Sequence, residues 1–184
     1  MQRIIQRTIR LFSQFTAGGA SLSMAVLFLI VFINSVRRYL IGKSFEWGEE
    51  LPIFIAIYGV MFGIAWAYML DRHIRFTMLV GFISESWTRK LYIIVDLIMV
   101  VNGILLTYSG WMFVIKRGGV EASGIINLAK NLKVLTGWDG MIWIGHQYPY
   151  QAAMVVGGVM LAIAALLKLL QRLTDNAAFE SVGG

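Results

Sequence analysis

The sequence predicts an all-α integral membrane protein with four transmembrane helices, both termini in the cytoplasm and short amphipathic helices at the membrane interface. Composition is the first indication, because the 184 residues are 58% hydrophobic and only 14% charged, whereas soluble domains carry about 25% charged residues. The second is the mean hydropathy of +0.72. The third is the gathering of apolar residues into four long stretches, since a helix needs roughly 20 mostly apolar residues to cross a bilayer.

The four stretches and their loops use up the chain, so we expect no separate soluble domain. They cover residues 11–36, 51–70, 91–115 and 147–167. The first is uncharged and too long for the roughly 7–15 apolar residues of a secretory signal, so we expect it to be a retained span. We therefore predict one membrane domain over residues 1–184, with an inner interfacial segment at 71–90 and an outer loop at 116–146.

The distribution of basic residues predicts that both termini are cytoplasmic. An even number of spans places the two termini on one side, which then has nine Lys and Arg residues against seven on the other. Cytoplasmic loops carry an excess of these residues, and the N-terminal tail adds Arg3, Arg7 and Arg10 without an acidic residue. The net charge of +6 is spread over many loops, so we expect contacts with anionic lipid headgroups and none with nucleic acid.

The connector between the first two spans, SVRRYLIGKSFEWGEELP, holds six charged residues in a short length. Ser44 is expected to cap the second helix, so that the acidic residues lie in its first turns, where the helix dipole favours carboxylates. The arginines before the turn can then meet the acids after it. Trp47, Leu51 and Phe54 are expected to share an apolar face of that helix.

Two interpretations of this connector stay open. It is either a solvated loop that neutralises its own charges, since exposed ion pairs contribute only about 0–1 kcal/mol, or a charged surface that docks another protein. The candidates for docking are Arg37, Arg38, Lys43, Glu46, Trp47, Glu49 and Glu50.

Three of the polar residues within the predicted spans are candidates for a specific role. Asp96 is the only charged residue well inside one, and such residues are functional candidates by default. It lies only about 9 Å along the helix from Lys90, so we expect it to reach the interface or to pair with a basic neighbour. Asn34 and Asn102 are expected to form hydrogen bonds between helices, each contributing about 0.6 kcal/mol.

Both loops outside the spans are predicted to contain short amphipathic helices. The segment DRHIRFTMLVGFISESWTRK is basic at both ends and apolar in the middle, as expected of a helix on the inner leaflet. In the outer loop, INLAKNLKVL places Ile126, Ala129, Leu132 and Val134 roughly at helical spacing. The candidates at the inner interface are Arg72, His73, Arg75 and Asp96.

No motif in the sequence indicates catalysis, a metal site or a cofactor. The chain has no cysteine, which excludes disulfides, thiolate catalysis and thiolate metal sites. Its two histidines, His73 and His146, fall on opposite sides of the membrane in the predicted topology. A haem held by two histidines inside the bundle is therefore not expected, and we predict neither a metal nor a catalytic residue.

The order of several motifs resembles the small membrane subunit of tripartite ATP-independent periplasmic (TRAP) transporters, the DctQ-like family. Members end the first span with Arg-Tyr, turn at a Gly, open the second span with Trp-x-Glu-Glu and follow it with His-Ile-Arg. The corresponding residues here are Arg38-Tyr39, Gly42, Trp47-Gly48-Glu49-Glu50 and His73-Ile74-Arg75. The resemblance is best over about residues 30–85. The chain departs from the family after His-Ile-Arg, where Phe76-Thr77-Met78 replaces the usual acidic residues.

The resemblance implies a subunit of a three-part uptake system in the bacterial inner membrane. A periplasmic binding protein would capture an organic anion, often a carboxylate, and a large multi-span subunit would carry it, driven by an ion gradient. This chain would form a heterodimer with the large subunit and would hold it in place without binding substrate.

Two other classes stay open on the residues alone. A self-sufficient small transporter or channel needs polar residues along a path, and the spans offer almost none. The membrane anchor of a redox enzyme needs ligand or acid–base residues inside the bundle.

Overall fold

The computed structural model describes residues 2–70 and 84–180, in which the regular elements are helices. The long helices are α1 (Gln2–Ile41), α2 (Glu50–Met69), α4 (Glu85–Arg117) and α6 (Tyr148–Glu180), and the shorter ones are η1 (Glu46–Gly48), α5 (Ile126–Thr136) and η2 (Asp139–Gly145). The four long helices are apolar enough over a sufficient length to cross a membrane. The prediction of an all-α fold with four membrane helices is therefore confirmed.

The long helices extend beyond the apolar stretches that predicted them. α1 begins at Gln2 and continues to Ile41, and α4 begins at Glu85 and continues to Arg117. Arg, Gln, Glu and Lys are good helix formers, so polar flanks prolong a helix after its apolar run has ended.

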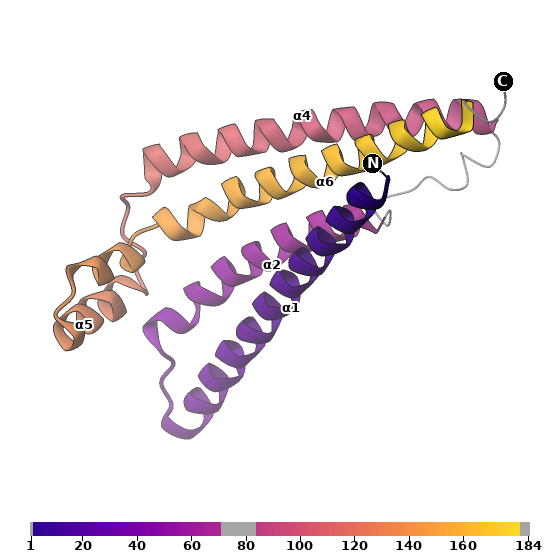
Figure 1. Ribbon diagram of the computed structural model, residues 1–184. Helices are drawn as coiled ribbons and strands as arrows, with labels where there is room; N and C mark the ends of the chain where they lie inside the picture. Colours follow the sequence, from indigo (N-terminus) through magenta and orange to yellow (C-terminus); the bar gives the residue numbers. More distant parts are fainter. Residues whose placement is uncertain (1, 71–83, 181–184) are drawn as a thin grey trace.

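The helices form two hairpins that share one bundle (Figure 1). α1 packs against α2, α4 packs against α6, and α6 also contacts α2 and part of α1. The hairpins lie close together at the end that holds both termini, here called the terminal end, and diverge toward the opposite end. At this loop end, α5 and η2 lie beside the start of α6. In the most apolar 18-residue stretch of α6, 44% of the residues are buried, against 6% in that of α1. α6 is therefore the central helix of the bundle.

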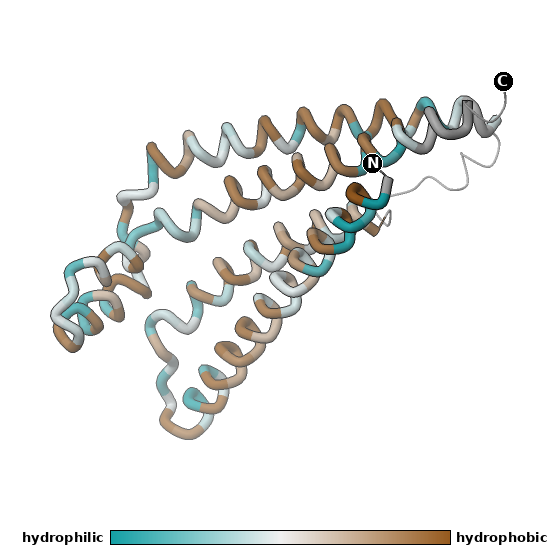
Figure 2. Tube along the Cα trace, viewed as in Figure 1, coloured by the Kyte–Doolittle hydropathy of each residue, from teal (hydrophilic) through white to brown (hydrophobic). Residues whose placement is uncertain are grey.

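Each end of the bundle has its own apolar cluster. At the terminal end, Tyr68 and Met69 of α2 pack on Leu161, Ala164 and Ala165 of α6. The loop-end cluster consists of Ala122, Ile125 and Tyr150, with Trp47, Leu51 and Phe54 packed against it. Between these clusters, hydrophobic residues run along the long helices (Figure 2).

Glycines allow α4 and α6 to approach closely. A Cβ atom added to Gly103 would lie 2.6 Å from the backbone nitrogen of Ala162. From the other helix, a Cβ atom on Gly158 would lie 2.5 Å from the backbone nitrogen of Thr107. Membrane helices associate through such small residues, because lipid gives no hydrophobic force between helices. These glycines therefore fix how α4 sits on α6.

Candidate functional site

Asn34 closes the connector between α1 and α2. Its Oδ1 atom accepts a hydrogen bond from the Phe45 backbone N–H at 2.8 Å, and its Nδ2 atom donates to the Gly48 carbonyl at 3.3 Å. Gly42 has a φ of +74°, which a residue with a side chain rarely adopts, so it provides the turn. Asn34 thus joins two elements as predicted, although its partners are backbone groups of the connector.

The start of α2 differs from the prediction. Glu46–Gly48 form a separate 3-10 turn, and α2 begins only at Glu50, with Glu49 at the cap position. The prediction that Ser44 caps the helix through its side chain is therefore wrong. Pro52 explains the later start, because proline has no N–H and is tolerated in a helix only in its first turn.

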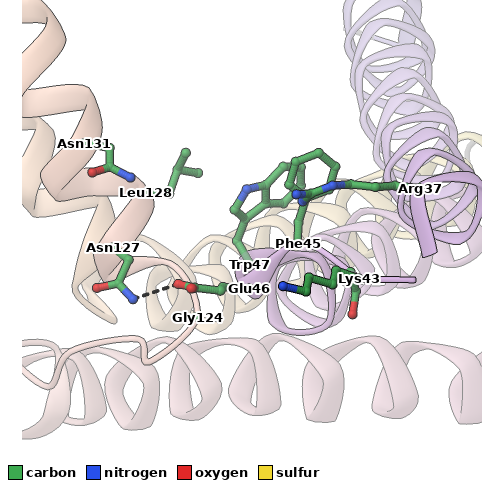
Figure 3. Close-up of a pocket in the computed structure, with 10 residues that line it drawn as sticks. Arg37, Lys43, Phe45, Glu46, Trp47, Gly124, Asn127, Leu128 and Asn131 are labelled. Carbon is green, nitrogen blue, oxygen red and sulfur yellow. Dashed lines mark hydrogen bonds between the residues drawn. The ribbon is translucent and has the colours of Figure 1, made fainter. Parts of the chain in front are cut away.

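Two of the connector carboxylates contact the loop that follows α4. The Glu50 Oε2 atom accepts a hydrogen bond from the backbone N–H of Gly124 at 2.9 Å. The Glu46 Oε2 atom accepts one from the Asn127 side chain at 2.7 Å (Figure 3). These contacts fasten the first hairpin to the second at the loop end.

The predicted pairing of arginines with acids across the connector is wrong for the described residues. None of the ion pairs found there joins Arg37 or Arg38 to a glutamate. Glu46 of the 3-10 turn and Glu50 of α2 instead accept hydrogen bonds from Asn127 and Gly124. Arg37 lies over the Phe45 ring, with its Cζ atom 3.8 Å from the ring centroid.

The apolar face predicted for Trp47, Leu51 and Phe54 is confirmed as a packing surface. All three pack on the loop-end cluster, and the Phe54 ring stacks on Tyr150 with centroids 4.2 Å apart. The Tyr150 hydroxyl also donates to the Ile144 carbonyl at 2.7 Å. Apolar packing and hydrogen bonds therefore act together to hold α2, η2 and α6 in place.

A pocket of about 330 Å³ lies between the connector and α5 (Figure 3). Arg37, Lys43 and Trp47 line it on the connector side, and Asn127 and Asn131 line it on the α5 side. Neither cation forms an ion pair with a described residue. Glu46 lines the pocket as well, so two cations and one carboxylate lie there beside amide and aromatic groups.

The predicted docking residues fall into two groups. Glu46, Trp47 and Glu50 make contacts within the chain. Arg38, Lys43 and Glu49 are exposed, and Arg37 is half-buried over Phe45. The second group is available to another protein, and its role in docking stays a prediction.

Asp96 is buried at the terminal end, where three helices meet. Its carboxylate is 1% exposed, and the Tyr68 hydroxyl donates to its Oδ1 atom at 2.5 Å. The Arg172 Nε atom lies 2.6 Å from its Oδ2 atom, although the N–H direction makes this an ion pair without an aligned hydrogen bond. The expected basic partner is therefore present, but it comes from α6 and not from the nearby Arg89 or Lys90.

Arg172 has a second contact that fixes its position. Its guanidinium lies over the ring of Tyr92, with the Cζ atom 4.6 Å from the ring centroid. Arg172 was not among the predicted partners of Asp96, because it follows the last apolar run of the sequence. The sequence did contain one indication of this role, because Arg172 is a basic residue in the helical continuation of the last span.

The outer loop contains the predicted helix α5. Ile126 and Ala129 are buried, as its pattern indicates, whereas Val134 is 82% exposed and does not belong to the buried face. After α5, the Lys133 Nζ atom lies 2.6 Å from Asp139, and this ammonium lowers the pKa of the Asp139 carboxyl below its usual value. The pair therefore persists above that usual pKa and is lost as the pH falls through the lowered one. That α5 lies at the membrane interface stays a prediction.

The remaining candidates are distributed as follows. Arg72, His73 and Arg75 lie outside the described residues. His146 belongs to the loop end, where its Nδ1 atom lies 2.9 Å from the Ile142 carbonyl. Within residues 2–70 and 84–180, no group of three or more His, Cys, Asp or Glu side chains could hold a metal ion.

Asn102 does not behave as predicted. Its side chain is exposed on α4, and its amide forms no hydrogen bond within the described part of the chain. Gly103 lies on the face of α4 that packs on α6. Adjacent residues of a helix point in different directions, so Asn102 lies to the side of that face.

Comparison with known proteins gives one family match. The model of the family described as tripartite ATP-independent periplasmic transporters, DctQ component, matches residues 27–175. No curated protein matches the chain.

Proposed function

The chain belongs to the DctQ family of tripartite ATP-independent periplasmic transporters, and we propose that it packs against the large membrane subunit of such a transporter and stabilises it. The family match over residues 27–175 carries this proposal and confirms the resemblance noted in the sequence. A DctQ protein is a multi-pass membrane component of a transporter, and its family is not a family of enzymes.

The complete system, in this proposal, takes up an organic anion, most simply a carboxylate, across the bacterial inner membrane. A periplasmic binding protein delivers the anion, and the large subunit carries it, driven by an ion gradient. The small subunit does not bind the anion. The Asp96 carboxylate, buried between the spans, is paired with Arg172 and Tyr68, so it is not available to bind a coupling cation either.

The surface of the bundle also supports a role as a subunit. In the most apolar 18-residue stretches of α1 and α4, only 6% and 11% of the residues are buried. Both outer helices therefore present long apolar flanks. A flank of this kind can face lipid or a partner helix. A subunit that packs beside a larger membrane protein needs such a flank, whereas a transporter that works alone needs a polar path through its own helices.

The loop end supports contact with the binding protein. Arg38, Lys43 and Glu49 are exposed there, close to the pocket that Arg37 lines. Charged groups at the edge of an interface steer a soluble partner and fix its orientation. We assign these residues to docking in the predicted topology, in which the loop end faces the periplasm.

The test is co-expression of the tagged chain with the large subunit of its own transporter. Purification in a mild detergent is expected to recover the large subunit in equal amounts. Liposomes are expected to take up organic anions only when both subunits and the binding protein are present. The proposal is wrong if the chain alone is stable and monodisperse and transports the anion, or if an oxidoreductase is recovered in place of the large subunit.

A further inference from the structure

The position of Asn102 on α4 indicates a second contact surface. Asn102 lies midway along the candidate span Trp87–Arg117, about 22 Å along the helix from either end. Its side chain is exposed, and its amide has no hydrogen-bond partner among the described residues. A bilayer contains no water at this depth, so an amide facing lipid would lose all of its hydrogen bonds.

The helix itself does not satisfy this amide. Serines and threonines in a span can donate to the carbonyl four residues earlier, as the partly buried Thr107 does to Gly103 at 2.8 Å. An asparagine side chain has two donors and an acceptor, so one such bond leaves most of its capacity unused. An exposed serine such as Ser21 on α1 therefore indicates little. The exposed amide of Asn102 instead requires a partner beyond the residues that the structure describes.

The surroundings of Asn102 form a continuous face. Val95, Ile98, Asn102 and Ser109 lie on one side of α4, at intervals of three, four and seven residues, and all four are exposed. α4 packs against α6 and makes no comparable contact with any other described element. This face is therefore open along the length of the span.

We propose that the Asn102 face of α4 binds a transmembrane helix of the large subunit, and that this helix places a hydroxyl, amide or free carbonyl group opposite Asn102 at mid-membrane depth. This inference rests on the proposed function, because the large subunit is the membrane partner that it supplies. The large subunit is preferred to a second copy of the chain because membership of the DctQ family implies a different membrane protein as the partner.

Site-specific crosslinking tests the face directly. A benzophenone amino acid is introduced at Ile98 or, as a matched control, at Ile104, and each variant is co-expressed with the large subunit. The two isoleucines are similarly exposed, at 52% and 56%, on the same helix. Ile98 lies on the Asn102 face, whereas Ile104 lies about 200° around the helix from Asn102. Illumination is expected to join the large subunit to position 98 and not to position 104.

A second variant tests the hydrogen bond. Asn102→Leu is expected to lower the recovery of the large subunit by about three- to fifteen-fold, in line with hydrogen bonds between membrane helices. Asn102→Gln keeps the amide and is expected to restore part of the recovery, and Ile104→Leu serves as the control. The thermal stability of the isolated chain should not fall with Asn102→Leu, because leucine suits a lipid-facing position.

The outcomes separate the inference from the proposed function. If the large subunit co-purifies but crosslinks only at position 104, or at neither position, the inference is wrong and the proposed function stands. A crosslink from position 98 to a second copy of the chain also overturns it. If the unmodified chain recovers no large subunit, the proposed function fails and the inference fails with it.

Discussion

The Glu50 carboxylate accepts a hydrogen bond from the backbone N–H of Gly124 at 2.9 Å, across 74 positions of sequence. This bond joins the start of α2 to the loop before α5. A second contact lies beside it, between Glu46 of η1 and Asn127 of α5. Acidic residues that look in the sequence like a surface for a partner therefore act within the chain, where they hold the two hairpins together at the loop end.

Replacing Glu50 should destabilise this end of the bundle. Glu50→Ala leaves the half-buried N–H of Gly124 without an acceptor, which typically costs about 1–3 kcal/mol, whereas Glu50→Gln retains a carbonyl acceptor and should cost less. We expect faster cleavage of residues 118–146 by an added protease and a lower unfolding temperature in detergent. Glu49→Ala is the matched control, because the Glu49 side chain is exposed. Equal effects at the two positions would contradict the assignment.

Charge reversal on the exposed part of the connector should separate docking from folding. Lys43→Glu and Glu49→Lys change exposed residues and should leave the unfolding temperature unchanged. If these residues meet the binding protein, uptake by reconstituted transporter should fall at low ionic strength, and the loss should shrink as added salt screens the new repulsion. Normal uptake by both variants, measured at low ionic strength, would show that this surface is only solvated.

The Asp96–Arg172 pair should be among the most sensitive points of the bundle. Removing one partner of a buried pair typically costs about 3–5 kcal/mol, because the other charge is left buried. Asp96→Leu and Arg172→Leu are each expected to lower the yield and the unfolding temperature. The double variant should lose less than the sum of the two. Simple additivity of the two losses would show that the residues do not act as a pair.

The elements that hydropathy determines were predictable from the sequence, and the contacts between distant helices were not. Four apolar stretches predicted four membrane helices, because length and polarity alone decide which segments cross a bilayer. The partner of Asp96 was missed because it depends on the register of α6 against α4, which Gly103 and Gly158 set through close backbone contact. The start of α2 was predicted too early, because Ser44 suits a cap position and the restriction of Pro52 to the first turn of a helix was not taken into account.

The candidate site shows the same division. Trp47, Leu51 and Phe54 were recognised as one face because their spacing is local. The partners of Glu46 and Glu50 could not be recognised, since Gly124 lies in the loop before α5 and Asn127 in α5, and the position of both depends on the whole bundle. Asn102 was assigned an internal bond because an asparagine in a span needs a partner, and the sequence does not tell whether that partner belongs to the same chain.

The close approach of α4 and α6 can be tested with one substitution at two glycines. Gly103→Ala would place a Cβ atom 2.6 Å from the Ala162 backbone nitrogen, which cannot move aside as a side chain can. The helices must separate, at a cost of about 1–3 kcal/mol. Gly63→Ala is the matched control, because a Cβ atom there meets nothing within 4 Å, and alanine favours a helix over glycine by roughly 0.5–1 kcal/mol. We therefore expect opposite shifts in unfolding temperature. A loss of stability at Gly63 equal to that at Gly103 would mean that helix contact does not explain the effect.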